Sequence, residues 1–232
     1  MRRSLLSQAQ VQGSAGRVLA LKDWLSSFEQ PGLEVVGCLE HQALALETAR
    51  RAVTLARDRD GLLPLKDATG RPWLALTPKP ADLTPAETSS YVRLHLGDAL
   101  RGAAGGPLAL GDALRGAQGG ALTEELTFSL NPSADEISAI LQRADGAAGV
   151  LVGTFNAIDH PGQAALLDAL AQRAAPVIAV ALRSPFDVTA VPALGTWLCT
   201  YSIQPSAIQA LGEALWGRIP FSGSLPVHLP VE

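Results

Sequence analysis

The sequence contains only two cysteines, Cys38 and Cys199, among its 232 residues. No histidine pair at ligand spacing accompanies them, so we expect neither a disulfide framework nor a zinc site. We interpret both as buried, reduced thiols, since Cys199 lies within an apolar run. The four histidines are scattered and predict no metal site: His41, His95, His160 and His228.

Charged residues are also scarce, at 17% of the chain with a net charge of −4. Without a basic surface, we expect neither nucleic acid nor an anionic membrane as a partner. No apolar run approaches the ~20 residues of a membrane span. The first six residues start like a signal peptide, but the polar segment 7–10 ends their apolar run too soon. We therefore expect a cytoplasmic protein.

Nucleotide-binding and nucleophile motifs are absent as well. Gly153 stands alone after an apolar run, without the other glycines of the G-x-G-x-x-G pattern that lets a pyrophosphate approach the backbone. The sequence contains no P-loop, and Ser184 and Ser202 lack the residues of a nucleophile elbow. We therefore predict no cofactor and no serine nucleophile.

What the sequence does contain is organised around one central segment. Two continuous apolar runs, 150–152 and 177–182, predict strands buried on both faces. Between them Pro161 suits a first helical residue, with Asp159 or His160 available to cap it. Helical spacing follows at Leu166, Leu167, Leu170 and Ala174. Because a crossover of this length joins parallel neighbours, we predict a β-α-β unit.

Similar patterns predict strands and helices along the rest of the chain. The first strand of the sheet is expected at 72–77, and others at 126–130 and 196–200. Residues 1–16 are expected to form an extended arm. Helices are expected at 17–28, 40–57 and 85–101, after a cap at Asn131-Pro132, and from Pro205. This alternation predicts an α/β fold, a three-layer α/β/α sandwich with a mainly parallel sheet.

A short tandem repeat lies within this pattern. The segment 97–103 recurs as 111–117. Two copies are too few for a solenoid, and the glycines predict a loop or a frayed helix extension at the second copy.

Polar side chains gather where the two central strands are expected to end. Open α/β sheets bind ligands at this edge. The candidate ligand-binding residues are therefore Thr154, Asn156, Arg183 and Asp187. An alternative is that these residues tie the two loops together, with Asp187 paired to Arg183 across the turn that Pro185 restricts.

Five segments, in order along the chain, carry a resemblance to a known family. They are 41–65, 152–157 (VGTFNA), 183–187 (RSPFD), 200–202 (TYS) and 223–227 (GSLPV). Together they resemble the C-terminal domain of family 3 glycoside hydrolases, in the branch of the bacterial β-N-acetylhexosaminidases. Residues 14–22 resemble the last segment of the preceding barrel domain. The resemblance implies an arm and barrel remnant at 1–36 and a C-terminal α/β sandwich domain at 37–232.

The resemblance also implies that the catalytic residues lie elsewhere. In the family, a carboxylate nucleophile and an acid/base group, an Asp-His pair in this branch, lie on loops of a (β/α)₈ barrel. Such a barrel takes ~250 residues, whereas only residues 1–36 precede the sandwich, so we assign no catalytic residue. Asp159 and Asp187 follow adjacent strands and could form the carboxyl pair of a retaining hydrolase, but helix capping and loop pairing are the readings we favour.

Two functions remain open. By resemblance, the chain is a non-catalytic structural or accessory domain, inactive alone, of a glycosidase whose complete form hydrolyses terminal β-N-acetylglucosaminides. The alternative is a free-standing module that binds a sugar or nucleotide in the strand-end crevice. By resemblance, the predicted helix 17–28 would pack on the missing barrel domain through Val18, Leu21, Trp24, Leu25 and Phe28. Without the barrel, we expect it to dock on its own sandwich or on a second copy, preferably in a symmetric homodimer.

Overall fold

The computed structural model describes residues 6–66, 71–81, 86, 92, 94, 96, 123–173 and 175–229. The chain divides into two compact units, Met1–His41 and Gln42–Glu232. The tandem repeat lies outside the described residues, as does the predicted helix 85–101 apart from four single positions. Within the described parts, no helix is both long enough and apolar enough to cross a membrane.

The first unit holds helix α1 (Gln8–Ser26) and the 3₁₀ turn η1 (Leu33–Val35). α1 begins with a capping box, in which the Ser7 hydroxyl accepts from the Gln10 N–H and the Gln10 side chain accepts from the Ser7 N–H. The prediction of an extended arm at 1–16 is therefore wrong from residue 8 onward. The cap and the helix-forming glutamines and alanines start the helix before its apolar residues begin.

The second unit is built on a six-stranded sheet with the order β1-β6-β5-β4-β2-β3. Its strands are β1 (Thr54–Asp58), β2 (Trp73–Pro78), β3 (Thr123–Phe128), β4 (Gly149–Thr154), β5 (Val177–Ala181) and β6 (Thr196–Cys199). Neighbouring strands pair in parallel except β1, which runs antiparallel to β6. The prediction of a mainly parallel sheet is confirmed.

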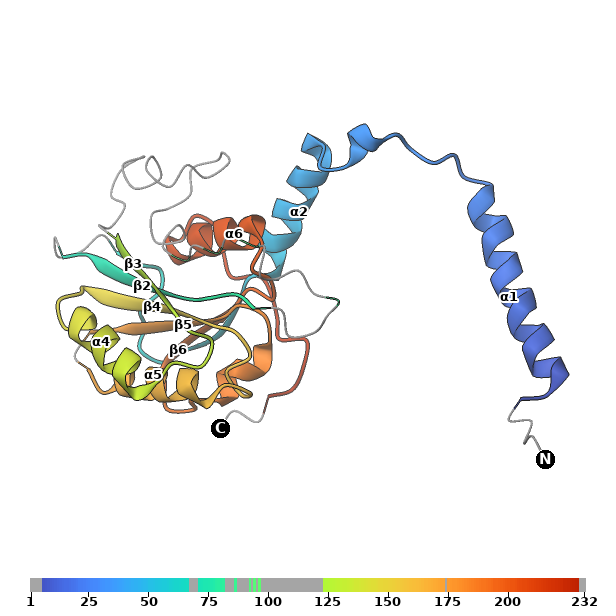
Figure 1. Ribbon diagram of the computed structural model, residues 1–232. Coiled ribbons are helices and arrows are strands. Elements are labelled where there is room, and N and C mark those ends of the chain that lie inside the picture. The colour runs from blue at the N-terminus through green and yellow to red at the C-terminus, as the bar shows by residue number, and fades with distance from the viewer. Residues whose placement is uncertain are drawn as a thin grey trace, which may run out of the picture. The chain divides into compact units, whose positions relative to one another are not determined.

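Helices cover both faces of this sheet (Figure 1). α4 (Ala134–Ala144) and α5 (Pro161–Ala171) pack on one face. α6 (Pro205–Leu215) packs on the other face, with α2 (Leu39–Ala52) beside it. This arrangement confirms the three-layer α/β/α sandwich.

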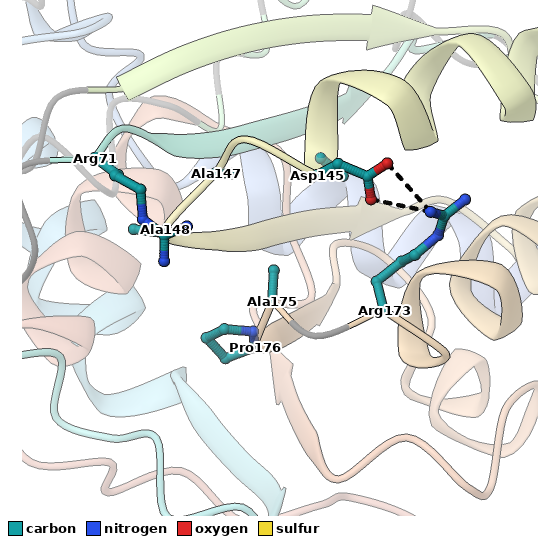
Figure 2. Close-up of a pocket in the computed structure, with 8 residues that line it drawn as sticks. Arg71, Asp145, Ala147, Ala148, Arg173, Ala175 and Pro176 are labelled. Atoms are coloured by element: carbon teal, nitrogen blue, oxygen red, sulfur yellow. Dashed lines mark hydrogen bonds and ion pairs between the residues drawn. The ribbon is translucent and has the colours of Figure 1, made fainter.

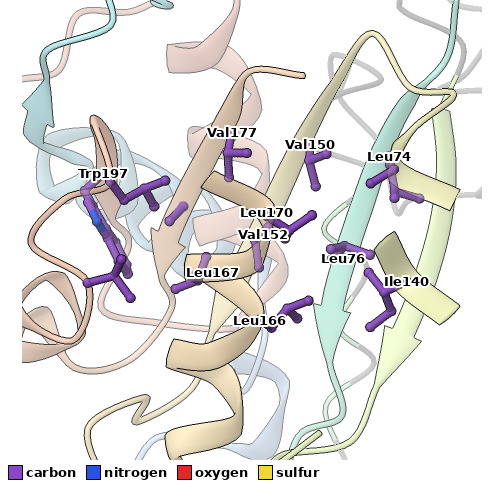
Figure 3. Close-up of a cluster of buried hydrophobic side chains, with 14 of the residues drawn as sticks. Leu74, Leu76, Ile140, Val150, Val152, Leu166, Leu167, Leu170, Val177 and Trp197 are labelled. Carbon is purple, nitrogen blue, oxygen red and sulfur yellow. The ribbon is translucent and has the colours of Figure 1, made fainter. Parts of the chain in front are cut away.

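Two clusters of apolar side chains fill the spaces between the sheet and the helices. The first, shown in Figure 3, joins the strands to α4 and α5 through Leu74, Leu76, Val150, Val152, Ile140, Leu166 and Leu170. The second joins the alternate strand residues to α6 through Trp73, Ala75, Leu151, Ile178, Ile208 and Leu211. Because successive side chains of a strand point to opposite faces, a sheet covered on both sides requires continuous apolar runs such as 150–152.

The helix predicted at 40–57 ends at Ala52, and β1 follows it. The first strand of the sheet is therefore β1 and not the segment 72–77, which lies mostly in β2. Helical periodicity continues into β1, but its backbone pairs with the edge of β6. The β-branched Val53 and Thr54 also favour an extended chain.

Pro161 begins α5 as predicted, but its cap comes from a different loop. The N-cap residue, His160, makes no capping hydrogen bond with its side chain. Instead Asn131 Oδ1 accepts from the backbone N–H of Gly162 at 2.7 Å. α4 is capped by Ser133 and not by the predicted Asn131-Pro132, which leaves the Asn131 amide free to serve the neighbouring helix.

Candidate functional site

The predicted site residues lie at the edge of the sheet where β4 and β5 end. Thr154 is the last residue of β4 and pairs with the last residue of β5. The loop after β4 carries Asn156, and the loop after β5 carries Arg183 before it turns into the short helix η3 (Pro185–Thr189), which includes Asp187. The structure thus places all four residues at the ends of two neighbouring strands or on the connections that follow them, as predicted.

Thr154 and Asp187 are in direct contact. The Thr154 hydroxyl donates to Asp187 Oδ2 at 2.7 Å, and the backbone N–H of Ala157 donates to Asp187 Oδ1 at 2.9 Å. Both Thr154 and Asp187 are fully buried, with 0% of their surface exposed. Asp187 therefore ties η3 to the end of β4 and to the loop that follows it.

Arg183 is not the partner of Asp187 that the sequence predicted. Its guanidinium lies 5.4 Å from the centre of the Phe155 ring, within the range at which a ring face attracts a cation. The hydrogen bonds of Asp187 come instead from Thr154 and Ala157. The predicted Arg183–Asp187 pair is wrong because the turn of η3 directs the carboxylate inward, toward β4.

Burial raises the pKa of Asp187 from its ordinary 3.8 to about 6. The hydrogen bonds from Thr154 and from the backbone of Ala157 and Asn156 act in the opposite direction, and the negative charge of Asp159 adds to the increase. Asp187 can therefore gain or lose a proton close to neutral pH.

Asn156 has an unusual backbone conformation for a residue other than glycine. Its φ is 54°, in the left-handed region that asparagine tolerates better than most residues. Its Oδ1 atom is buried without a hydrogen-bond partner among the described residues, and so is Nε2 of His160. Because buried polar atoms are nearly always paired, this loop combines backbone strain with unmet hydrogen-bonding capacity.

Gln163 is a central residue of this edge that the sequence analysis missed. Its side chain is buried, its Oε1 accepts from the Phe155 N–H at 2.9 Å, and its Nε2 donates to the carbonyl oxygens of Leu130 and Phe155 at 2.8 and 3.0 Å. The sequence did contain a sign of this role: Gln163 falls on the same helical face as Leu166 and Leu170, where a polar residue is unexpected. Its amide fixes the start of the loop after β4.

Asp159 and Asp187 do not present a pair of carboxyl groups to solvent. Asp159 is exposed, whereas both oxygens of Asp187 are buried and hydrogen bonded. Retaining hydrolysis needs one carboxylate free to attack and a second carboxyl to act as acid. In the described parts of the chain, no three His, Cys, Asp or Glu side chains lie together as metal ligands.

A small pocket of about 130 Å³ lies at the opposite edge of the sheet, where β2, β4 and β5 begin. Figure 2 shows Arg71 on one side of it and Arg173 on the other. Arg173 Nη1 donates to both oxygens of Asp145, at 3.0 and 3.2 Å. The remaining lining is small and apolar: Ala144, Ala147, Ala148, Ala175 and Pro176. None of the predicted site residues contributes to this pocket.

No protein-family model matches the chain, and no curated protein matches it. Solved structures do match. The chain is similar over 100% of its length, with a TM-score of 0.77 and 26% identity, to a glycoside hydrolase family 3 β-N-acetylglucosaminidase from Paenibacillus sp. str. FPU-7.

Two further solved structures share the fold at lower identity. A fungal multi-domain family 3 β-N-acetylglucosaminidase matches 99% of the chain with a TM-score of 0.68 and 22% identity. A β-glucosidase involved in saponin metabolism from intestinal bacteria matches 97% of the chain with a TM-score of 0.60 and 20% identity.

The chain spans less than half of each of these proteins. It covers 42% of the Paenibacillus chain, 24% of the fungal chain and 39% of the β-glucosidase chain. The segments singled out in the sequence and the structural matches point to the same family. The chain is thus similar, over its whole length, to one part of the larger family 3 glycoside hydrolases.

Proposed function

We propose that this chain is a non-catalytic structural or accessory domain, the C-terminal α/β sandwich, of a family 3 glycoside hydrolase whose complete form hydrolyses terminal β-N-acetylglucosaminides. The observation that carries the proposal is the match of the whole chain, at 26% identity, to 42% of the Paenibacillus β-N-acetylglucosaminidase. The proposed substrate class comes from that relative.

The described residues support a domain without chemistry of its own. The one strongly buried carboxyl at the strand ends, Asp187, uses both oxygens to hold neighbouring backbone and side-chain groups. A retaining glycosidase needs two carboxyl groups about 5 Å apart on either side of the sugar bond. Here Asp159 is exposed while Asp187 is enclosed, so the two do not face a common substrate site.

The apolar residues of α1, together with Phe28 just beyond its end, support a docking partner. The side chains of Val18, Leu21, Trp24, Leu25 and Phe28 are all exposed in this chain. Trp24 and Phe28 pack edge to face with their ring centres 4.9 Å apart. Contiguous exposed apolar surface marks interaction sites. We assign this surface to the barrel domain of the complete enzyme; the alternative is a second copy in a homodimer.

An activity assay tests the first part of the proposal. We expect the purified chain to leave a chromogenic β-N-acetylglucosaminide unhydrolysed. Turnover that survives repurification and is lost in Asp187→Ala or Asp159→Ala would overturn it, because the activity would then come from this chain.

Light scattering and mixing experiments test the docking surface. If the barrel is the partner, the chain binds the portion of the Paenibacillus enzyme that it does not match, and Trp24→Ala weakens that binding. If the chain forms a homodimer, light scattering on the chain alone gives twice the mass of one chain, and the Trp24→Ala variant gives the mass of a monomer. Leu44→Ala is the matched control, since Leu44 is an equally exposed apolar residue on α2. A monomer that binds nothing contradicts both partners.

A second candidate function is small-molecule binding at the strand-end crevice. The observation that favours it is Asn156, with its left-handed backbone and a buried Oδ1 that has no hydrogen-bond partner among the described residues. Shifts of the Asn156 and Arg183 signals on NMR titration with N-acetylglucosamine or a nucleotide would support it.

We also propose a cytoplasmic location. The two cysteines, neither of which forms a disulfide, support it, because reducing compartments keep thiols unpaired.

A further inference from the structure

One carboxyl group joins the two loops at the carboxyl edge of the sheet. Asp187 Oδ2 faces the Thr154 hydroxyl and Oδ1 faces the Ala157 N–H. The Thr154 hydroxyl has a second acceptor within reach, the Val180 carbonyl oxygen at 3.4 Å. Thr154 therefore stands between a carboxyl group and a backbone carbonyl, and its hydrogen can point to either.

This arrangement satisfies both protonation states of Asp187. In the ionised state, the Thr154 hydroxyl and the Ala157 N–H each donate to one carboxylate oxygen. When one proton arrives from solvent, the new O–H at Oδ2 donates to Thr154 Oγ1, whose own hydrogen turns to the Val180 carbonyl. Ala157 continues to donate to Oδ1. A hydroxyl can make this exchange because it is both donor and acceptor and rotates freely.

The two protonation states of Asp187 differ in the strength of their hydrogen bonds. Hydrogen bonds to an ionised acceptor are roughly twice as strong as those between neutral groups. Burying the charge of the fully enclosed Asp187 outweighs this gain, since the net effect is a raised pKa. The loop after β4 depends on the hydrogen bonds of Asp187, since Asn156 is strained and the buried Asn156 Oδ1 and His160 Nε2 have no partner among the described residues. Gln163 holds only the start of this loop, at Phe155.

We propose that Thr154, Asp187 and Ala157 form a proton-sensitive clasp, which holds the loop after β4 more firmly when Asp187 is protonated than when it is ionised, because opening the clasp hydrates a buried carboxylate. The clasp also positions two exposed apolar side chains, because Ile158 follows Ala157 and Phe186 precedes Asp187. Protonation thus changes how firmly Ile158 and Phe186 are held at this edge. The inference does not depend on the proposed glycosidase function.

Other titratable and charged groups surround the clasp. Asp159 and His160 lie on the same loop, Arg183 lies on the loop after β5 over Phe155, and Cys199 lies on β6. Burial raises the pKa of Cys199 to about 12, so this thiol stays neutral while Asp187 titrates. Burial likewise raises the pKa of Asp187 to about 6, which places the exchange near neutral pH.

Carbon-13 NMR of the Asp187 carboxyl between about pH 4 and pH 8 tests the clasp, since an ordinary Asp titrates near 3.9. We expect a midpoint near 6, and Ala157 amide exchange, corrected for the intrinsic rate, that is slower below this midpoint than above it. Asp187→Asn should remove this step in amide exchange. His160→Gln, which removes a different titratable side chain from the loop on which Ala157 lies, should leave the step in place.

The Thr154→Val variant tests the hydroxyl exchange. Valine has the shape of threonine but cannot donate to the carboxylate, so the Asp187 midpoint should rise by about one pH unit. Thr189→Val is the control, because the Thr189 hydroxyl donates to the Phe186 carbonyl within η3 and not to Asp187. A wild-type midpoint below about 5, or Ala157 exchange without a step at the midpoint, overturns the clasp even if Thr154→Val fails to fold. An unchanged midpoint in a folded Thr154→Val protein overturns the role of the hydroxyl.

Discussion

Arg50 and Glu213 meet in a two-bond ion pair that joins α2 to α6. Arg50 Nε donates to Glu213 Oε2 at 2.6 Å, and Nη2 donates to Oε1 at 2.7 Å. Glu213 is buried, and the hydrogen bonds from Arg50 lower its pKa. The apolar contact between the same helices is small, with Ala49 packing against Val53, Ala210 and Ala214. The ion pair therefore orients α2 on the sandwich.

Arg50→Ala should lower the free energy of unfolding by about 1–2 kcal/mol, because it leaves the Glu213 carboxylate buried without its charge partner. The partial exposure of Arg50 keeps the cost below that of a fully buried pair. Urea denaturation measures it. Arg51→Ala is the control, since the Arg51–Glu47 pair on the same helix is exposed and should contribute under about 0.5 kcal/mol. Equal effects of the two variants would contradict this account.

Asp187 should make stability fall as pH rises. Its pKa is higher in the folded protein, at about 6, than the ordinary 3.8. The folded state therefore binds more protons between these values, and the stabilisation present below pH 3.8 is lost as pH rises through 6. The loss is about 3 kcal/mol at most.

The Asp187→Asn variant isolates this contribution from other titrating groups. Its amide can donate to Thr154 and accept from Ala157, so the fold is retained without the buried charge. The unfolding free energy of the variant minus that of the wild type should increase between about pH 4.5 and pH 7.5. A difference that stays constant or decreases over this range shows that Asp187 is ionised throughout.

Gln163→Leu should destabilise the protein by about 2–4 kcal/mol, because it leaves the Phe155 N–H and the carbonyl oxygens of Phe155 and Leu130 buried without partners. Thermal denaturation measures the effect. Gln172→Leu, at the exposed end of the same helix, should change stability by less than about 0.5 kcal/mol. Similar melting temperatures for both variants would falsify the role given to Gln163.

Gly162→Ala should cost about 1–3 kcal/mol, since the added Cβ would lie 2.5 Å from the Pro132 carbonyl oxygen and 2.7 Å from Asn131 Oδ1, the cap of α5. Gly146→Ala is the matched substitution, because its Cβ would come no closer than 3.9 Å to the Arg143 carbonyl oxygen. That variant should be neutral or slightly stabilising. Urea denaturation of both proteins compares them, and a neutral Gly162→Ala would mean that the 131–132 loop moves away readily.

The predicted β-α-β unit shows which parts of the fold are determined by residues close together in the sequence. Its two apolar runs became β4 and β5, and the leucines at helical spacing between them became the buried side of α5. These residue patterns lie within single helices and strands, where side-chain periodicity and burial on both faces are compatible with only one secondary structure. The same reasoning failed at β1, because the segment has helical periodicity and becomes a strand only through pairing with β6.

By itself, therefore, the sequence determined the α/β class, the parallel sheet and the two loops that meet at its carboxyl edge. The tertiary structure decided which polar groups pair there: Asp187 bonds to Thr154 and Ala157, Asn131 caps α5, and Gln163 holds Phe155. Patterns of neighbouring residues set the faces of helices and strands. A buried polar group must instead find its partner among atoms distant in sequence, and only packing brings those within hydrogen-bonding distance.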